Sequence, residues 1–250
     1  MDNLKTIRAL IERCNRTCSL LNPVEGALTY AKDLSVFSLL ENLKDQIVLI
    51  PKDTSELAPA HIQVIEVENP RLIFVLCHNK INRGNLPAEN RVSRDAVVHK
   101  SAIIGAEGLS LCRDPAYRDP PADIVRFKHM GSVVIKAGAY IGPYSVVHRA
   151  TLDQTVISEQ ATVGALCNIG HNVYVGPQSI LTACISVGGS SHIGESCYVG
   201  MGAMIMDHIK ICDHVRIGMG AIVTKDIKVP GIYHGNPATY KGPWDGGWHR

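Results

Sequence analysis

The sequence of 250 residues has almost no net charge, no long apolar run and no obvious targeting segment. A formal net charge of +2 gives no reason to expect nucleic acid or an acidic membrane surface as a partner. No apolar stretch approaches the length of a membrane span, and MDNLKTIRALIERC lacks the apolar core of a signal peptide. We therefore expect a cytoplasmic protein with no membrane span and no nucleic-acid partner.

The sequence also lacks the short motifs of common cofactor sites. Its eight cysteines form no CxxC pair, so neither a zinc knuckle nor a redox motif is present, and no metal site is expected. We interpret the cysteines as small buried residues of a reducing compartment rather than as a disulfide framework. Residues 1–88 contain no glycine-rich phosphate loop, which argues against a Rossmann-type cofactor site.

A six-residue repeat dominates the second half of the chain. One aliphatic residue occupies every sixth position, often followed by glycine: Ile157, Val163, Ile169, Val175, Leu181, Val187, Ile193, Val199, Ile205, Ile211, Ile217, Val223 and Val229. This period is too short for a helical repeat, but it fits short β-branched strands with a small residue at each corner. Three such repeats would make one triangular coil of about 18 residues with the aliphatic residue pointing inward. We therefore predict an all-β solenoid, a parallel β-helix.

The same register is visible upstream, with two interruptions. Its markers are Val92, Val98 and Ile104 for one coil and Ile135, Ile141 and Val147 for the next. The stretch 105–132 between them, with CRDPAYRDPPAD at its centre, cannot be a coil because proline lacks the amide hydrogen that a ladder requires. We interpret this stretch as a functional loop. The second interruption is a ten-residue step from Val147 to Ile157.

Residues 1–88 differ in kind. Helical spacing in 4–14 and 34–44, short apolar runs in 46–51 and 62–67, and Pro70 at a suitable place for a first helical turn predict a small α/β domain. This domain either recognises a nucleotide or caps the open end of the β-helix, and the residues leave both interpretations open. The predicted parts are thus the α/β domain 1–88, the β-helix 91–229 with the loop insertion 105–132, and a C-terminal tail 230–250.

Two histidines are candidate catalytic residues. His171 is the third residue of its hexad and His208 the fourth, and both hexads fall on the same edge of the predicted prism, two coils apart. Parallel strands stack about 4.8 Å apart, so the two side chains are expected roughly 10 Å apart. The hexad between them begins VGGSS, and its small residues Gly188, Gly189 and Ser190 would leave a groove. Because histidine transfers protons near neutral pH, this arrangement favours a catalytic site.

Several segments carry a family resemblance. GSVVIKAGAYIG, VHRATLDQTVI, NIGHNVYVG, ISVGGSSHIG and MDHIKICDHV, in this order and spacing, resemble the hexapeptide-repeat acyltransferases, in particular the UDP-acylglucosamine N-acyltransferases of lipid A synthesis. The resemblance covers most of 91–229, including the ten-residue step. It implies a left-handed β-helix and a homotrimer with active sites between neighbouring helices. It also implies that His171 is the general base and that His208 lies beside the acyl donor.

The resemblance also implies a set of binding residues. For the nucleotide sugar these are Asn69, Arg149 and Asp153. At Arg71 the family more often has an aromatic residue, so the nucleotide or its contacts can differ. For the acyl donor the residues are Gly188, Gly189, Ser190, Gly202, Ala203, Gly220, Ala221 and Lys225. Backbone amides near Gly188 to Ser190, or those of an adjacent coil, are candidates for holding the oxyanion.

The C-terminal tail decides between two branches of the family. The lipid A enzymes end in a long helix that helps to bind acyl carrier protein, whereas GIYHGNPATYKGPWDGGWHR is too rich in glycine and proline for a helix. GNPA resembles the coenzyme-A-dependent branch, which acylates nucleotide-linked amino sugars for surface polysaccharides. We therefore predict transfer from acyl-CoA, acetyl or short hydroxyacyl, to such a sugar amine. The alternative is the acyl-carrier-protein-dependent UDP-3-O-acylglucosamine N-acyltransferase.

Zinc catalysis is a further alternative. Some hexapeptide-repeat proteins hold zinc with three histidines, and this solenoid contains His148, His171, His192, His208 and His214. No two of them form a closely spaced pair on one predicted face, so the sequence argues against a tetrahedral zinc site.

Overall fold

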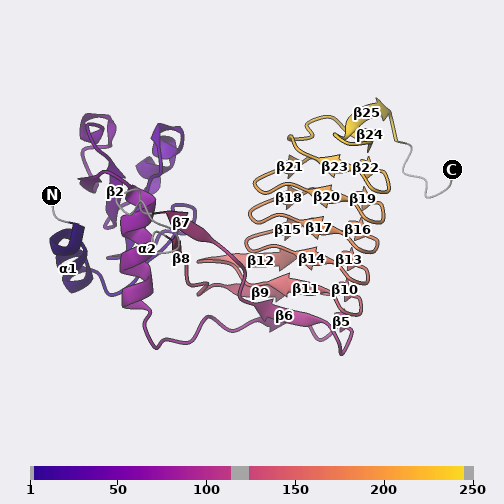
Figure 1. Cartoon of the computed structure of the whole chain (residues 1–250), viewed down its shortest axis with the longest axis horizontal. Coiled ribbons are helices and arrows are strands. Elements are labelled where there is room, and N and C mark those ends of the chain that lie inside the picture. Colours follow the sequence, from indigo (N-terminus) through magenta and orange to yellow (C-terminus); the bar gives the residue numbers. More distant parts are fainter. Residues whose placement is uncertain (1–2, 114–123, 245–250) are drawn as a thin grey trace. The chain divides into compact units, whose positions relative to one another are not determined.

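The computed structural model describes residues 3–113 and 124–244, which form two compact units. The N-terminal unit comprises residues 1–86 and 109–130, and the β-helix unit comprises 87–108 and 131–250 (Figure 1). Residues 109–113 and 124–130 of the predicted loop insertion thus belong to the N-terminal unit. Residues 114–123 of the predicted loop and 245–250 of the tail lie outside the described residues.

Three sheets of short strands form the β-helix unit, and their pairings are parallel except at the last strand of the first sheet (Figure 1). The first sheet contains β5 (Val97–Val98), β10 (Tyr140–Ile141), β13 (Thr162–Val163), β16 (Ile180–Leu181), β19 (Tyr198–Val199), β22 (Val215–Ile217), β24 (Gly231–His234) and β25 (Thr239–Gly242). The second contains β6 (Ile103–Ala106), β11 (Val146–His148), β14 (Asn168–Ile169), β17 (Ser186–Val187), β20 (Met204–Ile205) and β23 (Ile222–Val223). The third contains β4 (Arg91–Val92), β9 (Ser132–Ile135), β12 (Gln154–Ile157), β15 (Tyr174–Val175), β18 (His192–Ile193) and β21 (Lys210–Ile211).

The strand register confirms the predicted triangular coil. Asn168 pairs with Ser186, and Ser186 pairs with Met204, so each turn advances by 18 residues. The upstream markers also pair as expected, with Val92 opposite Ile135. Across the ten-residue step the advance is 22 residues, because Val146 pairs with Asn168. The four extra residues therefore bulge out of one coil, and the three sheets continue on both sides of it.

The aliphatic ladder forms the core of this unit. The twelve predicted inward residues from Ile157 to Val223 are all at most 3% exposed. The thirteenth prediction, Val229, is wrong, because its side chain is 56% exposed. The last coil is shorter, and Ile227 takes the inward place by bridging to Ile211. The periodicity therefore ends one repeat earlier than the sequence suggested.

The corners of the regular repeats turn in the same way. The fourth residue of each hexad from Ile157 to Ile217 has a positive φ, including Leu166 at 57°, Asn172 at 59° and Gly202 at 70°. The second residue is often glycine because the next coil lies too close for a side chain: a Cβ atom on Gly164 would lie 1.3 Å from the carbonyl oxygen of Thr182. The parallel sheets and these repeats fit the expected left-handed β-helix.

The N-terminal unit is built on a three-stranded parallel sheet. Its strands are β1 (Leu28–Tyr30), β2 (Ile47–Pro51) and β3 (Gln63–Val67), and its α-helices are α1 (Asn3–Arg13) and α2 (Pro70–Ile81). The 3₁₀ helices are η1 (Leu34–Asn42) and η2 (Ser55–Leu57), and β7 (Leu111–Arg113) pairs antiparallel with β8 (Ile124–Arg126). The apolar pattern of 34–44 thus belongs to a 3₁₀ helix, begun by Asp33, whose side chain accepts a hydrogen bond from the amide of Ser35. Pro70 begins α2, as predicted.

The cysteine prediction needs one correction. All eight thiols are free, and six are buried. Cys184 is exposed at a corner with a φ of 55°, and Cys212 is half-buried, so these two are not core residues. Burial raises the pKa of the Cys197 thiol to about 11, which makes it a poor nucleophile. None of the helices that the structure describes is long and apolar enough to span a membrane.

Candidate functional site

His171 lies at a corner of the β-helix, directly after β14. Its imidazole occupies the space left by the missing side chain of the next coil: a Cβ atom on Gly189 would lie 2.6 Å from Nε2 and 2.7 Å from Cε1 of His171. Gly189 is therefore the residue that lets the ring lie across the corner. The imidazole of His171 thus fills the space that the absent side chain of Gly189 leaves at this corner.

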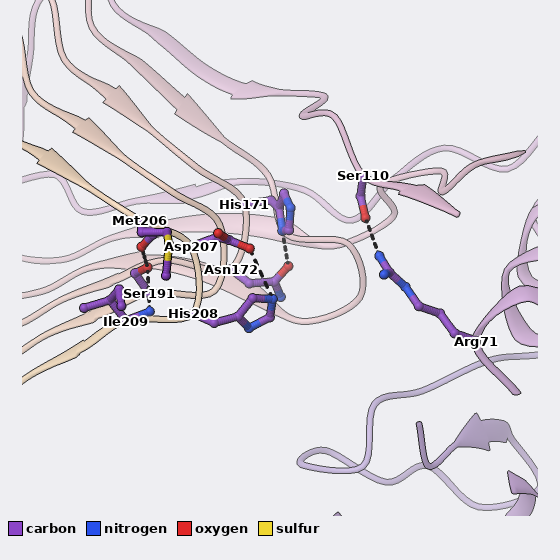
Figure 2. A network of polar contacts seen from close by, with 9 residues as sticks. All are labelled: Arg71, Ser110, His171, Asn172, Ser191, Met206, Asp207, His208 and Ile209. Atoms are coloured by element: carbon purple, nitrogen blue, oxygen red, sulfur yellow. Dashed lines mark hydrogen bonds and ion pairs between the residues drawn. The ribbon is translucent and has the colours of Figure 1, made fainter. Parts of the chain in front are cut away.

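The neighbouring Asn172 holds the other side of this ring (Figure 2). Oδ1 of Asn172 lies 3.0 Å from Nδ1 of His171. The same oxygen accepts hydrogen bonds from the backbone N–H and the hydroxyl of Thr151, each at 3.0 Å. Sequence reasoning did not find this partner. The HN pair alone gave no signal, because the decisive contact comes from a residue 21 positions earlier.

His208 lies on the same edge of the prism, as predicted, but in a different column of the corner. The amide of His208 donates to the carbonyl of Gly189, and the amide of Ser190 donates to the carbonyl of His171. Asp207 is therefore the residue that shares the corner position of His171, while His208 shares that of Asn172 and Ser190. The side chains of His208 and Asp207 are 74% and 63% exposed and lie 3.9 Å apart, which is a weak, solvent-screened contact (Figure 2).

Backbone hydrogen bonds around Gly189 limit which amides of this corner could hold an oxyanion. The amide of Gly188 donates to the carbonyl of Ile205, and the amide of Ser190 is also engaged, so neither is available. Within the described residues, the N–H of Gly189 donates to no partner. Ser191 is buried behind the corner, where its hydroxyl donates to the carbonyl of Met206 and accepts from the amide of Ile209 (Figure 2). One amide, that of Gly189, remains beside the imidazole.

Some predicted donor-binding residues are structural. Ala203 and Ala221 are fully buried in the core, and their amides donate to the carbonyls of Gly200 and Gly218. This burial corrects the expectation that they face a donor. Gly202 and Gly220 occupy corners with φ of 70° and 65°, where an added Cβ atom would meet nothing. Lys225 is exposed.

The predicted nucleotide-binding residues have structural roles of their own. Asn69 caps α2, accepting a hydrogen bond from the amide of Leu72 at 3.0 Å. Arg149 donates from Nε to the carbonyl of Gly105 at 2.7 Å and lies 3.5 Å from the carbonyl of Gly131. The carbonyl of Asp153 accepts from the amide of Ser132, which ties the bulged coil to its neighbour.

In the N-terminal unit, Arg71 contacts Ser110, the residue before β7. Nη2 of Arg71 lies 3.4 Å from the hydroxyl of Ser110 (Figure 2). Burial raises the pKa of the Tyr30 phenol, and the guanidinium of Arg71 offsets part of this rise. The side chain of Arg71 is half-buried.

His192 and His148 each contact a different neighbouring side chain. His192 stacks on Tyr174 with ring centroids 4.5 Å apart, and its burial lowers its pKa. Nε2 of His148 lies 2.9 Å from Oδ1 of Asn168. Among residues 3–113 and 124–244, no three His, Cys, Asp or Glu side chains are grouped closely enough to hold a metal ion.

The family described as bacterial transferase hexapeptide (six repeats) matches residues 190–225. UDP-3-O-acylglucosamine N-acyltransferase of Coxiella burnetii is 38% identical over 153 residues, which cover 61% of this chain and 43% of that protein. The protein of the same name from Hahella chejuensis is 36% identical over 57% of this chain and 39% of its own length.

The chain resembles the hexapeptide-repeat acyltransferases. It spans less than half the length of the curated relatives it matches. Among solved structures, Arabidopsis UDP-N-acetylglucosamine acyltransferase has a TM-score of 0.52 at 15% identity over 92% of this chain and 70% of that chain, a likeness of fold alone. The relatives and this neighbour are acyltransferases, the class of enzyme that the sequence predicted.

These relatives overturn the predicted main function. The curated relatives from Coxiella burnetii, Janthinobacterium and Hahella chejuensis are named UDP-3-O-acylglucosamine N-acyltransferase, which was the alternative to the coenzyme-A-dependent reaction. The misleading signal was GNPA at 235–238. In the structure this segment joins β24 to β25, a hairpin whose first strand extends the first sheet beyond β22. The motif therefore has a structural explanation that says nothing about the donor.

Proposed function

We propose that this protein transfers an acyl group from an acyl-carrier-protein thioester to the amine of a UDP-linked 3-O-acylglucosamine. The observation that carries the proposal is the imidazole of His171, held by Asn172 and lying across the side-chain-free corner at Gly189. The names of the curated relatives support the acceptor. The resemblance to the lipid A enzymes supports an acyl-carrier-protein thioester as the donor in place of coenzyme A.

The proposed reaction is direct acyl transfer. The acceptor amine attacks the thioester carbonyl carbon, and Nε2 of His171 accepts the proton that the nitrogen loses. The N–H of Gly189 donates a hydrogen bond to the tetrahedral oxyanion. The carbon–sulfur bond then breaks, and the leaving thiolate takes the proton from the imidazolium, which regenerates the base. His208 is exposed and lies two coils from His171. It is proposed to contact the donor, together with Lys225.

We further propose that the working form is a homotrimer and that the N-terminal unit recognises the nucleotide, in which Asn69 and Arg71 take part. Exposed apolar residues support the trimer. Tyr144, Leu166, Met201 and Met219 are 51–73% exposed and all lie at the corners between the first and second sheets. Exposed apolar stripes of this kind mark interaction surfaces.

The test is acyl transfer measured by mass spectrometry of the sugar nucleotide. Acyl-carrier-protein thioesters and coenzyme A thioesters of several chain lengths are each supplied with UDP-3-O-acylglucosamine. We expect an amide product with the carrier-protein donors, and a loss of roughly 10²–10⁴-fold in the His171→Ala variant. Turnover with coenzyme A thioesters alone, or normal turnover by the variant with its oligomeric state intact, would contradict the proposal.

A further inference from the structure

The three contacts of Asn172 define the orientation of its amide. A backbone N–H, that of Thr151, can only donate, so the atom that faces it at 3.0 Å must be the carbonyl oxygen Oδ1. The hydroxyl of Thr151 lies 3.0 Å from the same oxygen. This anchoring fixes the amide independently of His171. The side chain of Asn172 therefore presents an acceptor, and not its NH₂ group, to the imidazole.

The protonation state of the imidazole follows from this acceptor. Nδ1 of His171 lies 3.0 Å from Oδ1 of Asn172, so Nδ1 carries the hydrogen and donates it. A neutral imidazole has one N–H, and the lone pair is then on Nε2. Nε2 is also the ring atom nearest to the space above Gly189, at 2.6 Å from a built Cβ position. The basic nitrogen is thus the one on the Gly189 side of the ring.

The bulged coil supplies the residues that hold Asn172. Thr151 belongs to the four-residue excess that makes this turn 22 residues long instead of 18. Thr155, on the same coil and fully buried, accepts a hydrogen bond from the backbone N–H of Asn172 at 2.9 Å. With a φ of 59°, Asn172 is of a residue type that tolerates this conformation. The irregular coil therefore contacts both the backbone and the side chain of one residue.

We propose that Thr151 and Asn172 are positioning residues that hold His171 in the Nδ1–H tautomer, and that the bulged coil exists in part to provide Thr151. The tautomer stands on the geometry alone, whereas its catalytic consequence rests on the proposed acyl transfer. A neutral amide holds the ring without adding a negative charge beside it. A carboxylate in its place would favour the imidazolium and delay deprotonation to higher pH.

The variants are chosen to spare the fold. Asn172→Gly removes the amide but keeps a residue suited to positive φ, as Gly202 and Gly220 show at equivalent corners. Ser196→Gly makes the same change at a corner where φ is 54° and serves as the matched control. Thr151→Val removes the hydroxyl and keeps the backbone donor, and Thr151→Ser restores the hydroxyl. Asn172→Asp keeps the acceptor and adds the charge.

The first measurement is the tautomer, read from ¹⁵N chemical shifts of histidine-labelled protein with His171 assigned by its absence in His171→Gln. We expect Nδ1–H in the wild type, in Ser196→Gly and, when neutral, in Asn172→Asp, and a mixture of tautomers in Asn172→Gly. An Nε2–H tautomer in the wild type, or an unchanged spectrum in Asn172→Gly, overturns the proposal. This arm gives an answer even if no substrate is turned over, so it separates failure of the tautomer lock from failure of the proposed function.

The second measurement is the pH profile of kcat and kcat/KM with the substrates of the proposed reaction. We expect kcat to fall roughly 100-fold in Asn172→Gly with KM little changed, and roughly tenfold in Thr151→Val. Thr151→Ser should recover the wild-type rate. Asn172→Asp should shift the rising limb of the profile to higher pH. A rise in KM with kcat unchanged in these variants would assign the pair to substrate binding and overturn the positioning role.

Discussion

At the scale of single residues, the site depends on a side chain that is absent. His171 occupies the volume that a Cβ atom at position 189 would need, at 2.6 Å from Nε2. Gly189→Ala should therefore displace the imidazole and lower kcat/KM by roughly 10²-fold, because small misplacements of a catalytic group are costly. The same assay on Glu195→Ala, at the same corner position of another hexad, should show near-normal activity and thermal stability. Normal activity of Gly189→Ala would mean that the ring acts from another position.

The buried His78 of the N-terminal unit should make the stability of the protein depend on pH. Its Nε2–H donates to the carbonyl of Lys128 and its Nδ1 accepts from the hydroxyl of Thr17, so the ring is neutral. Burial lowers its pKa to about 4 from an ordinary 6.5. Because the unfolded state then binds more protons between these values, stability is fully present above pH 6.5 and is lost as pH falls toward 4. The loss is about 3 kcal/mol, at about 1.4 kcal/mol per pKa unit.

This prediction is checked by measuring the free energy of unfolding of the N-terminal unit in urea between pH 4 and 7.5. His78→Gln, which cannot titrate, should flatten the dependence, whereas His214→Gln, at an exposed corner, should leave it unchanged. A slope that is equally steep in His78→Gln would assign the pH dependence to other groups.

At the scale of secondary structure elements, Arg149 joins the two places where the chain leaves and re-enters the β-helix. Its guanidinium donates to the carbonyl of Gly105 and lies near that of Gly131, on either side of the 109–130 excursion. Arg149→Ala should lower the free energy of unfolding by about 1–3 kcal/mol without any substrate present, because buried acceptors lose a charged donor. Thermal unfolding measures this change. Arg94→Ala, at an exposed arginine, is the matched control and should leave the stability unchanged. Unchanged stability with a raised KM for the sugar nucleotide would instead support direct substrate contact.

The regular elements were predictable because the six-residue period is directly visible in the sequence. Each aliphatic residue has a partner 18 positions away, so one pattern specifies sheets, corners and core together. The same local reading failed where long-range contacts decide. Ile227 replaces Val229 because the last coil is shorter, and 34–42 adopts a 3₁₀ helix that helical spacing does not distinguish from an α-helix.

The candidate site was predictable in part for the same reason. The hexad count placed His171 and the small residues of the next coil together, since both follow from the repeat. Asn172 was missed as the partner because its role depends on Thr151, in the one coil that departs from the period. Ala203 and Ala221 were expected at the donor site because the positions were carried over from the family. Such a carry-over does not show whether a residue is exposed, and both residues are fully buried.

At the scale of the whole molecule, the proposed trimer explains an otherwise unfavourable surface. Leu166 and Met219 are 59% and 73% exposed at the corners between the first and second sheets, where an apolar stripe should be covered in the working form. Sedimentation equilibrium should therefore give the mass of three chains of 27.1 kDa. A lysine introduced at either position would have to be buried without a partner, so Leu166→Lys and Met219→Lys should each shift the protein to the monomer.

Val229→Lys controls for the general effect of removing an exposed apolar residue, because Val229 is 56% exposed but lies beyond the last repeat, away from these corners. It should remain trimeric. The family resemblance implies an active site between the β-helices of neighbouring subunits, and such a site requires the trimer. The monomeric variants should therefore lose acyl transfer although His171 and Asn172 are untouched. A monomeric Leu166→Lys protein with full activity would show that one chain carries a complete site, and a monomeric wild type would remove the need for the stripe to be an interface at all.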